Sequence, residues 1–397
     1  MRHASHQLPV AKPVLGEREV EAVRRVVLSG WVTQGPEVAA FESEFADFVG
    51  APHACAVSNC TNALHLALKC VGVGAGDEVI TVSHSFIATA NAIRYCDALP
   101  VFVDIETSGY NMDPDLVEAA ITPRTKAILC VHQLGMPCDL RRVVEIAKRH
   151  AIPVIEDAAC AAGSEILWQG QWERIGKPHG DIACFSFHPR KVVTTGDGGM
   201  LTTANVEHDR KFRLWRQHSM SVPDTVRHGA RQVIYEGYAE LGYNYRMTDL
   251  QAAIGREQLK RLGALVSRRR ELAEQYTERL SPVAGLQTPG EPAWARSNWQ
   301  SYCVGLSEWI DQRETMQALL DCGISSRRGV MNIHLEKAYV GSETHRAATS
   351  LTRSVVAQQT SVILPLFAQM SNADVALAVD TLLSIIAVAS PTALQAL

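Results

Sequence analysis

The hydrophobic and polar positions between residues 54 and 203 follow two alternating periods. Short apolar, β-branched runs predict strands at 54–58, 78–82, 100–104, 126–131 and 153–158. Segments with apolar residues at helical spacing separate these runs, at 61–70, 88–95, 114–120 and 140–150. Two more apolar runs, 182–187 and 199–203, predict a hairpin. Strands alternating with amphipathic helices indicate βαβ units, so we predict an α/β fold around a mostly parallel sheet covered on both faces.

The pattern changes after residue 247, where helical spacing runs to about residue 280. Proline and glycine then crowd together at positions 282–292, which marks a loop or a domain junction. Beyond it the pattern predicts a strand at 300–306, a helix at 311–322, a strand at 324–327 and a helix at 373–389. We therefore predict a large domain over 1–262 and a smaller C-terminal α+β domain over 263–397.

Composition supports two domains and argues against a nucleic-acid-binding protein. The chain has 397 residues, of which 47% are hydrophobic, so a large core can be buried. Its formal net charge of -4 gives no electrostatic reason to expect nucleic acid as a partner. The one basic run, Arg268-Arg269-Arg270, lies in a helical, polar stretch, and we interpret it as a solvated helix face.

Cysteine usage and the absence of long apolar segments bear on location. None of the 10 cysteines forms a C-x-x-C pair, and several lie inside apolar runs, as Cys130 does. Such usage favours a reducing compartment. The N-terminal residues lack the apolar stretch of a signal peptide, and the apolar stretch 381–390 is too short to span a bilayer. We expect a cytoplasmic protein without a membrane partner, and we predict no metal site.

Two known phosphate-binding patterns do not apply. No G-x-x-x-x-G-K-[ST] sequence occurs in the chain. The glycines at 72, 74 and 76 follow a predicted helix and precede a predicted strand, whereas a dinucleotide loop needs the opposite order. We interpret this segment as the turn that ends a helix.

Two polar stretches lie where predicted strands end. Residues 58–62 join a strand to a helix, and free N–H groups at a helix start bind phosphate well. Helix capping by Ser58 or Asn59 is the structural alternative. Glu156 and Asp157 end an apolar strand, where a buried carboxylate needs a partner such as a protonated pyridine nitrogen. A structural salt bridge is the alternative there.

Two further stretches add a lysine and an asparagine. Lys191 follows a predicted strand and precedes a loop of small residues, a setting that suits Schiff-base chemistry, although a lone lysine normally lies on the surface. Asn244 and Arg246 precede a helix that Thr248 or Asp249 could cap, and capping explains neither of them. A phosphate loop, a carboxylate, a lysine and an asparagine loop, in this order, match what a pyridoxal-5′-phosphate (PLP) aminotransferase needs.

Two longer motifs extend this match to a family. The segment SFHPRKVVTTGDGGMLTT around Lys191 and the N-terminal segment Ser29–Pro36 resemble motifs of the DegT/DnrJ/StrS family of PLP-dependent sugar aminotransferases. The resemblance runs from about Pro9 to about Val388, nearly the whole chain. It implies the aspartate-aminotransferase-like fold (PLP fold type I), with a large domain that carries the central sheet and a smaller C-terminal domain.

The resemblance also implies a role for each matching position. Lys191 resembles the lysine that carries PLP as a Schiff base and shuttles the proton, and Asp157 resembles the carboxylate that keeps the pyridine nitrogen protonated; these two are the predicted catalytic residues. The predicted cofactor-binding residues are Cys60, Thr61, Phe86, Asp157, Ser186, His188, Lys191 and Asn244. The predicted substrate-binding residues are Trp31, Thr33, Arg246, Arg328 and His334.

The implied reaction is a ping-pong transfer. An amino acid, L-glutamate, gives its amino group to the cofactor, and a keto-sugar linked to a nucleotide then receives it, with Lys191 as general base and general acid. Asn244 resembles a phosphate ligand donated by a neighbouring subunit, which implies a homodimer with shared active sites. The implied partners are small-molecule substrates, and the implied pathway makes amino sugars for a polysaccharide or an antibiotic.

Some positions depart from the family pattern, and there are three rival functions; Lys191 argues against the first of them, and Lys191, Asp157 and Asn244 argue against the third. Cys60 stands where glycine is usual, and both 133–138 and the long stretch 166–179 differ on the substrate side. One rival is the dehydratase branch of the family, in which histidine typically replaces the cofactor lysine. Another is an aminotransferase for a cyclic polyol ketone, as in aminocyclitol pathways. The third is a non-catalytic regulatory protein with the same fold.

Overall fold

A computed structural model describes residues 7–222, 224–341 and 343–389 of the chain. Its largest element is an eight-stranded sheet in the order β1-β9-β8-β5-β4-β2-β3-β14. These strands are β1 (His53–Val57), β2 (Glu78–Val82), β3 (Leu99–Val103), β4 (Thr125–Val131), β5 (Val154–Asp157), β8 (Ile182–Ser186), β9 (Gly199–Thr203) and β14 (Arg346–Ala347). All adjacent pairs are parallel except the two that involve β9. The predicted mostly parallel sheet and the predicted hairpin of β8 and β9 are confirmed.

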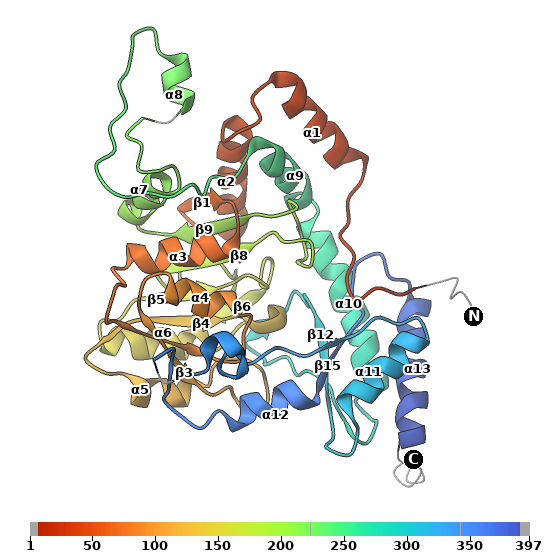
Figure 1. Cartoon of the computed structure of the whole chain (residues 1–397). Coiled ribbons are helices and arrows are strands. Elements are labelled where there is room, and N and C mark those ends of the chain that lie inside the picture. Colours follow the sequence, from red (N-terminus) through yellow and green to blue (C-terminus); the bar gives the residue numbers. More distant parts are fainter. Residues whose placement is uncertain (1–6, 223, 342, 390–397) are drawn as a thin grey trace.

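Helices cover both faces of this sheet (Figure 1). One face packs against α3 (Cys60–Cys70), α4 (Ala88–Arg94) and α7 (Val206–Trp215). The other face packs against α2 (Pro36–Val49), α5 (Val117–Ala120) and α6 (Leu140–Arg149), with a short 3-10 turn at Pro114–Leu116 leading into α5. Neighbouring positions of one strand enter opposite cores, as Ile155 and Val154 of β5 do, because side chains alternate across a sheet. Two-sided burial explains why the strands are mostly apolar on both faces.

A smaller unit packs beside the large sheet and has its own core. Its four-stranded sheet runs β10-β12-β15-β13, with β10 (Leu286–Gln287), β12 (Tyr302–Leu306), β13 (Arg327–Arg328) and β15 (Ser361–Leu364). The helices α10 (Leu262–Leu280), α11 (Gln312–Asp321) and α13 (Asn372–Ala389) surround this core. The predicted strand 324–327 is displaced, because Ile324 instead pairs with Leu8 near the N-terminus.

Segments far apart in sequence cross between the two units. The strand β14 comes from the C-terminal part of the chain but pairs with β3 at the edge of the large sheet. The following helix, α12 (Thr352–Thr360), is held by Asp104, whose carboxylate accepts the backbone N–H of Ser354 at 2.9 Å. The division into 1–262 and 263–397 stays a prediction, and it assigns β14 to the C-terminal part although β14 pairs within the large sheet.

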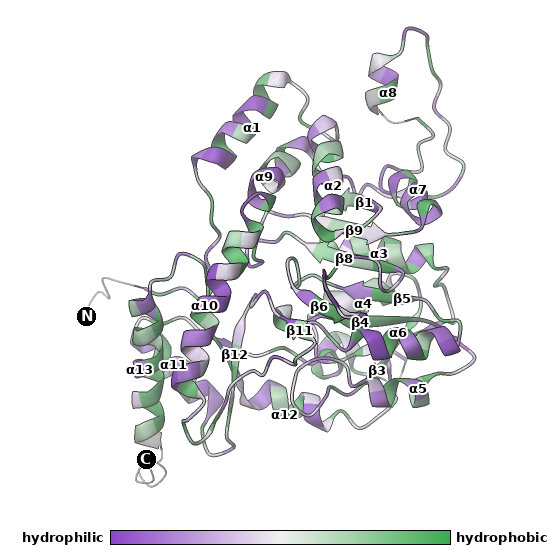
Figure 2. Ribbon diagram, turned by 180° about the vertical axis from the view of Figure 1, so that it is seen from behind, coloured by the Kyte–Doolittle hydropathy of each residue, from purple (hydrophilic) through white to green (hydrophobic). Residues whose placement is uncertain are grey.

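The basic run on α10 differs from its prediction at one residue. Arg269 is only 5% exposed, and its guanidinium donates to the carbonyls of Trp299, Gln300 and Leu366 at 2.6–2.9 Å. The interpretation as a solvated helix face is therefore wrong for Arg269. Its inward side chain ties α10 to the segment that enters β12, and Figure 2 shows the alternation of polar and apolar positions along α10.

Other parts of the fold gave no clear signal in the sequence. One such part is α1 (Glu17–Ser29), which packs beside the large sheet against α9 (Asp249–Leu259), a helix within the stretch where helical spacing was predicted. The stretch 166–179 forms most of a hairpin, β6 (Glu165–Trp168) with β7 (Gln171–Arg174), which β11 (Ala295–Arg296) extends. The segment around α8 (Asp224–Gly229) projects away from the body in both views (Figures 1 and 2). In the described part of the chain, no helix combines the length and apolarity that crossing a bilayer would need.

Candidate active site

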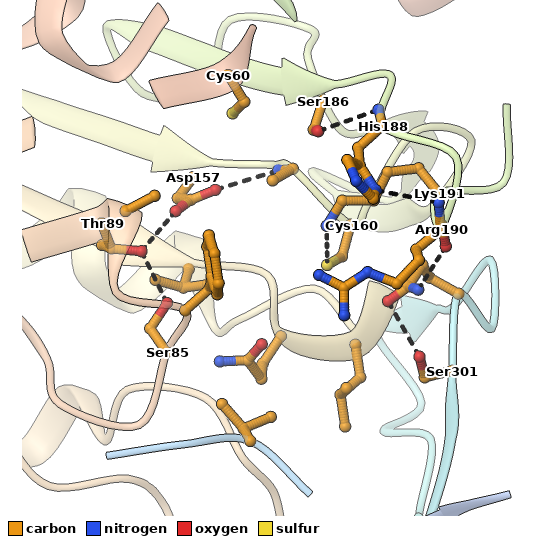
Figure 3. A pocket seen from close by; sticks show the side chains of 18 of the residues that line it. Cys60, Ser85, Thr89, Asp157, Cys160, Ser186, His188, Arg190, Lys191 and Ser301 are labelled. Atoms are coloured by element: carbon orange, nitrogen blue, oxygen red, sulfur yellow. Dashed lines mark hydrogen bonds between the residues drawn. The ribbon is translucent and has the colours of Figure 1, made fainter. Parts of the chain in front are cut away.

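A pocket of about 680 Å³ lies between the carboxyl ends of the central strands and the smaller unit (Figure 3). This volume is within the usual range for small-molecule sites. Seven of the residues expected to bind cofactor or carry out catalysis line it within one chain: Cys60, Thr61, Phe86, Asp157, Ser186, His188 and Lys191. The smaller unit adds polar side chains from Gln300, Ser301, Arg327 and Arg328. The β5 and β8 strands place Asp157 and Ser186 there because both strands end at the same edge of the sheet.

Asp157 is a buried carboxylate with neutral hydrogen-bond partners. The hydroxyl of Thr89 donates to its Oδ2 at 2.8 Å, and the backbone N–H of Ala159 donates to its Oδ1 at 3.2 Å. Ser85 and Thr89 share a further hydrogen bond of 2.7 Å. Burial raises the pKa of Asp157, although Thr89, Ala159 and the charge of Lys191 act in the opposite direction. A carboxylate in this setting is well suited to a cationic ring nitrogen as its partner.

The neighbouring Glu156 has a structural role instead. Its Oε2 lies 3.0 Å from Nε2 of His132, and both side chains are buried. The backbone N–H of Cys138 donates to Nδ1 of the same ring at 3.1 Å, so the ring proton lies on Nε2 and faces Glu156. The salt-bridge alternative considered for the acidic pair therefore applies to Glu156, while Asp157 faces the pocket.

Lys191 enters the pocket from the turn after β8. Its backbone N–H donates to the carbonyl of His188 at 2.8 Å, and its Nζ donates to the sulfur of Cys160 at 3.0 Å. Burial alone would lower the pKa of Lys191, but Cys160, Cys60 and Asp157 together outweigh burial and raise it. Figure 3 shows the lysine side chain directed at Cys160 inside the pocket. The Cys160 contact was not predicted, because an isolated cysteine in an alanine-rich segment gives no sign of a polar role.

The start of α3 forms another wall of the pocket. The side chain of Asn59 accepts the backbone N–H of Asn62 at 2.9 Å and so caps the helix. Among the described residues, the N–H groups of Cys60 and Thr61 have no protein acceptor, which leaves them for an anion. A Cβ on Gly199 would lie 2.5 Å from the carbonyl carbon of Asn59, so only glycine lets β9 pack this closely. Capping and anion binding therefore coexist at this helix start.

His188 and Phe86 complete this side of the pocket. Nδ1 of His188 accepts the backbone N–H of Arg190 at 3.2 Å, and burial, with help from the charge of Arg190, lowers the pKa of His188. The backbone N–H of His188 donates to Ser186 Oγ at 3.4 Å. Phe86 is 60% exposed although it is aromatic and lines the pocket. Its ring surface is available for stacking on a planar ligand.

Five predicted site residues do not line the pocket of their own chain. Trp31 donates from Nε1 to the carbonyl of Gln34 at 3.1 Å, and the carbonyl of Thr33 accepts the N–H of Asp249 at 3.0 Å. His334 lies in a 3-10 turn (Ile333–Leu335), with Nδ1 2.6 Å from Ser83 Oγ. The remaining two, Asn244 and Arg246, lie on the segment that follows α8, opposite Gln217 and Val57 respectively.

The pocket also contains residues that were not predicted. Thr89, Cys160 and Arg190 lie close in sequence to predicted residues, and the position of Arg190 directly before Lys191 was a usable signal. Gln300, Ser301 and Arg327 come from the smaller unit, and nothing in their local sequence indicates the pocket. Among the described residues, no group of three metal-ligating side chains is placed to hold a metal ion.

Comparison with known proteins gives matches over nearly the full chain. The model of the DegT/DnrJ/EryC1/StrS aminotransferase family matches residues 13–383. The spore coat polysaccharide biosynthesis protein SpsC of Bacillus subtilis is 38% identical over 375 residues, which cover 94% of this chain and 95% of SpsC.

Solved structures of similar proteins agree with this match. The aminotransferase TlmJ from Streptoalloteichus hindustanus superposes with a TM-score of 0.88 at 34% identity, covering 97% of this chain and 100% of TlmJ. DesV of S. venezuelae, solved in complex with a ketimine intermediate, gives a TM-score of 0.85 at 31% identity, covering 95% and 98% of the two chains. The expected fold, with its large mostly parallel sheet, is thereby confirmed.

Proposed function

This chain belongs to the DegT/DnrJ/EryC1/StrS aminotransferase family, and from that premise we propose that it transfers an amino group from L-glutamate to a nucleotide-linked keto-sugar with PLP as cofactor. The observation that carries the proposal is the placement of Lys191 and Asp157 in one pocket. A primary amine and a buried carboxylate without a cationic partner in hydrogen-bond contact fit the two ends of PLP, its carbonyl and its ring nitrogen. When bound, PLP accepts the electron pair released at the carbon that loses its proton.

Each pocket residue has a role in this proposal. Lys191 would hold the cofactor through Nζ and would act as the general base toward Cα of the amino donor. Asp157 keeps the ring nitrogen protonated. The phosphate is bound by the N–H groups of Cys60 and Thr61 and by the hydroxyl of Ser186. Phe86 and His188 contact the cofactor beside these groups.

We further propose a homodimer whose active sites are shared. Trp31, Thr33, Asn244 and Arg246 lie outside the pocket of their own chain, so they can serve a site only through a second subunit. The segment 230–245 exposes large apolar side chains, including Tyr235 at 92% and Leu241 at 81%. Exposed apolar surface of this kind is typical of interfaces. A dimer that covers this segment would bring Asn244 to the partner's phosphate site.

In this proposal, residues of the smaller unit that line the pocket determine which substrate binds. Arg327 and Arg328 face the pocket from β13 and would bind the diphosphate of a sugar nucleotide, while Ser83 holds His334 just outside the pocket. The name of the relative SpsC refers to polysaccharide biosynthesis, and we propose an amino sugar of such a pathway as the product. We place the enzyme in the cytoplasm, where its cysteines, all free among the described residues, would stay reduced.

An absorbance spectrum with PLP, repeated after adding L-glutamate, tests the proposal. We expect a visible band at about 410–420 nm that moves to about 330 nm with the donor, as for lysine-bound PLP that becomes pyridoxamine phosphate. Lys191→Ala should fold and lack the visible band. Full turnover in Lys191→Ala, or no visible band in the natural protein, would contradict the proposal. Keto-sugars with and without a nucleotide, and cyclic polyol ketones, would then be screened as acceptors.

A further inference from the structure

Arg190 is a charged residue in the pocket to which the proposed mechanism assigns no role. It directly precedes Lys191, and both residues line the same cavity. Figure 3 shows the arginine side chain reaching into the cavity from the same turn as the lysine. Among the described residues, its guanidinium has neither a hydrogen bond nor an ion pair. Five N–H donors therefore face a solvent-filled pocket without a protein acceptor.

The backbone of Arg190 is fixed on both sides, so its side chain starts from a defined place. Its N–H donates to Nδ1 of His188 at 3.2 Å, and its carbonyl accepts Nε2 of Gln300 at 2.9 Å. Gln300 belongs to the smaller unit, where Arg269 holds its carbonyl at 2.6 Å. Contacts from both units thus hold the turn that carries Arg190 and Lys191. The backbone from which the guanidinium extends is therefore held in place before a ligand arrives.

The charges in the pocket favour an anion at Arg190. The basic side chains that line it are Arg190, Lys191, Arg327 and Arg328, whereas the carboxylates are Asp157 and Asp197. Asp157 is already assigned to the cofactor ring, and the helix start at Cys60 is assigned to the cofactor phosphate. The guanidinium of Arg190 is left for an anionic group of a substrate. Carboxylates and phosphates both match the fork of an arginine.

We propose that Arg190 binds the α-carboxylate of the amino donor. This inference rests on the proposed function, because it names the residue that recognises the donor at the same site. Arg190 and Lys191 are adjacent in sequence, so the anion that Arg190 binds lies close to the carbon on which Lys191 acts. The α-carboxylate is bonded to that carbon in every amino acid. In a nucleotide-linked sugar, the ring separates the diphosphate from the keto carbon, and Arg327 and Arg328 on the other wall suit that group.

Two variants of Arg190 and one control test this assignment. Arg190→Gln removes the charge, Arg190→Lys keeps it without the fork, and Arg141→Gln removes an exposed arginine of α6 that lies outside the pocket. Stopped-flow absorbance would follow the PLP form of each protein with increasing L-glutamate. We expect Arg190→Gln to raise the apparent Kd for glutamate by roughly 10- to 100-fold, the range for losing a hydrogen bond to a charged group. Arg190→Lys should lie between Arg190→Gln and the natural protein, and Arg141→Gln should match the latter.

A second measurement is independent of turnover. Calorimetric binding of α-methyl-L-glutamate, which lacks the proton that Lys191 removes, should weaken by the same factor in Arg190→Gln. Unchanged binding of both donors, with weaker inhibition by uridine diphosphate, would assign Arg190 to the sugar nucleotide and overturn the inference. A weaker affinity for PLP would assign it to the cofactor and also overturn it. If the natural protein gives no PLP band at all, the proposed function itself has failed.

Discussion

The sulfur of Cys160 accepts a hydrogen bond of 3.0 Å from Nζ of Lys191. This contact favours the ammonium form of the lysine, and together with the nearby Cys60 and Asp157 it outweighs the burial that by itself would lower the lysine pKa. Only the neutral amine attacks a carbonyl, so Cys160 makes Lys191 less nucleophilic at a given pH.

Replacing Cys160 should therefore make Lys191 react with PLP at lower pH. In Cys160→Ala the pKa of Lys191 falls, and the pH midpoint of visible-band formation should fall with it. Cys160→Ser, which keeps a hydrogen-bond acceptor, should give a smaller shift. Absorbance titration of the two variants beside Cys322→Ala, an exposed cysteine outside the pocket, measures the effect. An identical midpoint in all proteins would mean that the sulfur does not tune Lys191.

Asp157→Asn should separate cofactor binding from chemistry. An amide cannot keep the ring nitrogen protonated, so the half-reaction with L-glutamate should slow by about 10²–10³-fold, the scale for losing one preorganised electrostatic partner. The visible band should still form, because Lys191 is unchanged. Single-turnover kinetics checks the rate. The matched control is Glu156→Gln, which should cost roughly 1–3 kcal/mol of stability through His132 and leave the rate near normal.

Thr89 should control the acid side of the pH profile. Its hydroxyl donates to Asp157 and lowers the pKa of that carboxyl, which burial raises. Thr89→Val removes the hydrogen bond, so the pKa of Asp157 rises and less of the carboxylate is ionised at low pH. The acid limb of PLP affinity should move to higher pH, while Thr89→Ser should keep the natural limb. If Thr89→Val and Thr89→Ser show the same acid limb of PLP affinity, the hydroxyl of Thr89 does not control the ionisation of Asp157.

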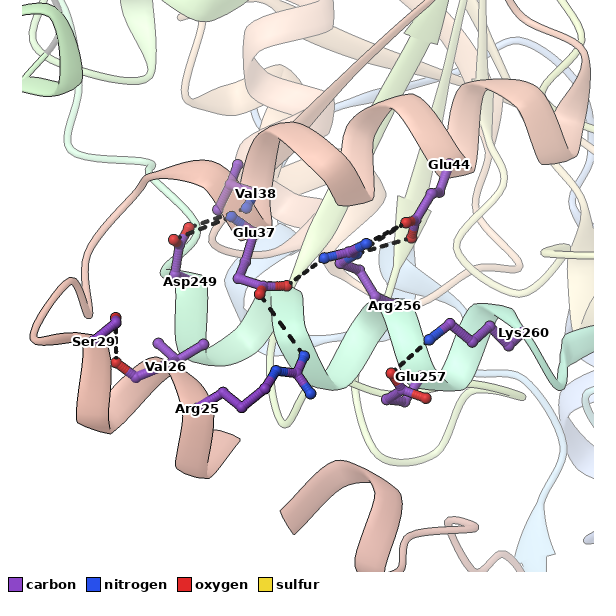
Figure 4. A network of polar contacts seen from close by, with 10 residues as sticks. All are labelled: Arg25, Val26, Ser29, Glu37, Val38, Glu44, Asp249, Arg256, Glu257 and Lys260. Carbon is purple, nitrogen blue, oxygen red and sulfur yellow. Dashed lines mark hydrogen bonds and ion pairs between the residues drawn. The ribbon is translucent and has the colours of Figure 1, made fainter. Parts of the chain in front are cut away.

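Glu42 should be a major contributor to stability. Its carboxylate forms ion pairs with Arg213 at 2.6 Å and with the buried Arg216, and it accepts the N–H of Ala56 at 2.8 Å. Glu42→Gln leaves Arg216 buried with a neutral partner, so we expect a loss of about 3–5 kcal/mol in urea unfolding. Glu44→Gln, which weakens a more exposed pair with Arg256 (Figure 4), should cost less than about 1 kcal/mol.

The ion pairs of Glu42 with Arg213 and Arg216 also make the free energy of unfolding depend on pH. Burial alone would raise the pKa of Glu42, but Arg216 and Arg213 outweigh burial and hold it below its usual value. A carboxyl with a depressed folded-state pKa stabilises the protein fully above its unfolded-state pKa, about 4.3, and this contribution is lost as the pH falls through the folded-state pKa. As the pH falls below the unfolded-state pKa, the natural protein should lose stability more steeply than Glu42→Gln. Parallel stability curves for the two proteins would contradict the assignment.

Mixing two inactive variants tests the shared site. Lys191→Ala lacks the reacting amine, and Asn244→Ala lacks the residue proposed to serve the partner's phosphate site. In a mixed dimer, one site combines the natural lysine of one subunit with the natural asparagine of the other. Refolding an equal mixture should restore roughly a quarter of the natural activity, as expected for random pairing in a two-fold dimer. No recovery, with dimers confirmed by light scattering, would place Asn244 in its own subunit's site.

The sequence predicts the central sheet well because its physical signal is local. Every position of β2 and β9 is buried, and most of these positions are apolar, so their predicted bounds, 78–82 and 199–203, agree with the structure. The predicted strand at 324–327 is displaced because its partner is Leu8, more than 300 residues away in sequence. Arg269 was misinterpreted for a similar reason, since its three carbonyl acceptors lie far along the chain.

The residues of the candidate site also differ in whether the local sequence could indicate them. Lys191, Asp157 and the start of α3 could be found because chemistry and strand ends coincide in the sequence. Cys160 and Thr89 needed the fold, which brings them within 3.0 Å of Lys191 and 2.8 Å of Asp157. Gln300 could not be found, because only the packing of the smaller unit brings it to the carbonyl of Arg190.

The pairing of β14 with β3 has a consequence for how the polypeptide is made. Residues 346–347 leave the ribosome long after β3 has emerged, so β3 must wait as an unpaired edge while more than half of the chain is translated. The N-terminal Leu8 also waits for Ile324. We therefore expect nascent chains to need shielding from aggregation until synthesis is nearly finished, and a chain that stops at residue 262 to be insoluble.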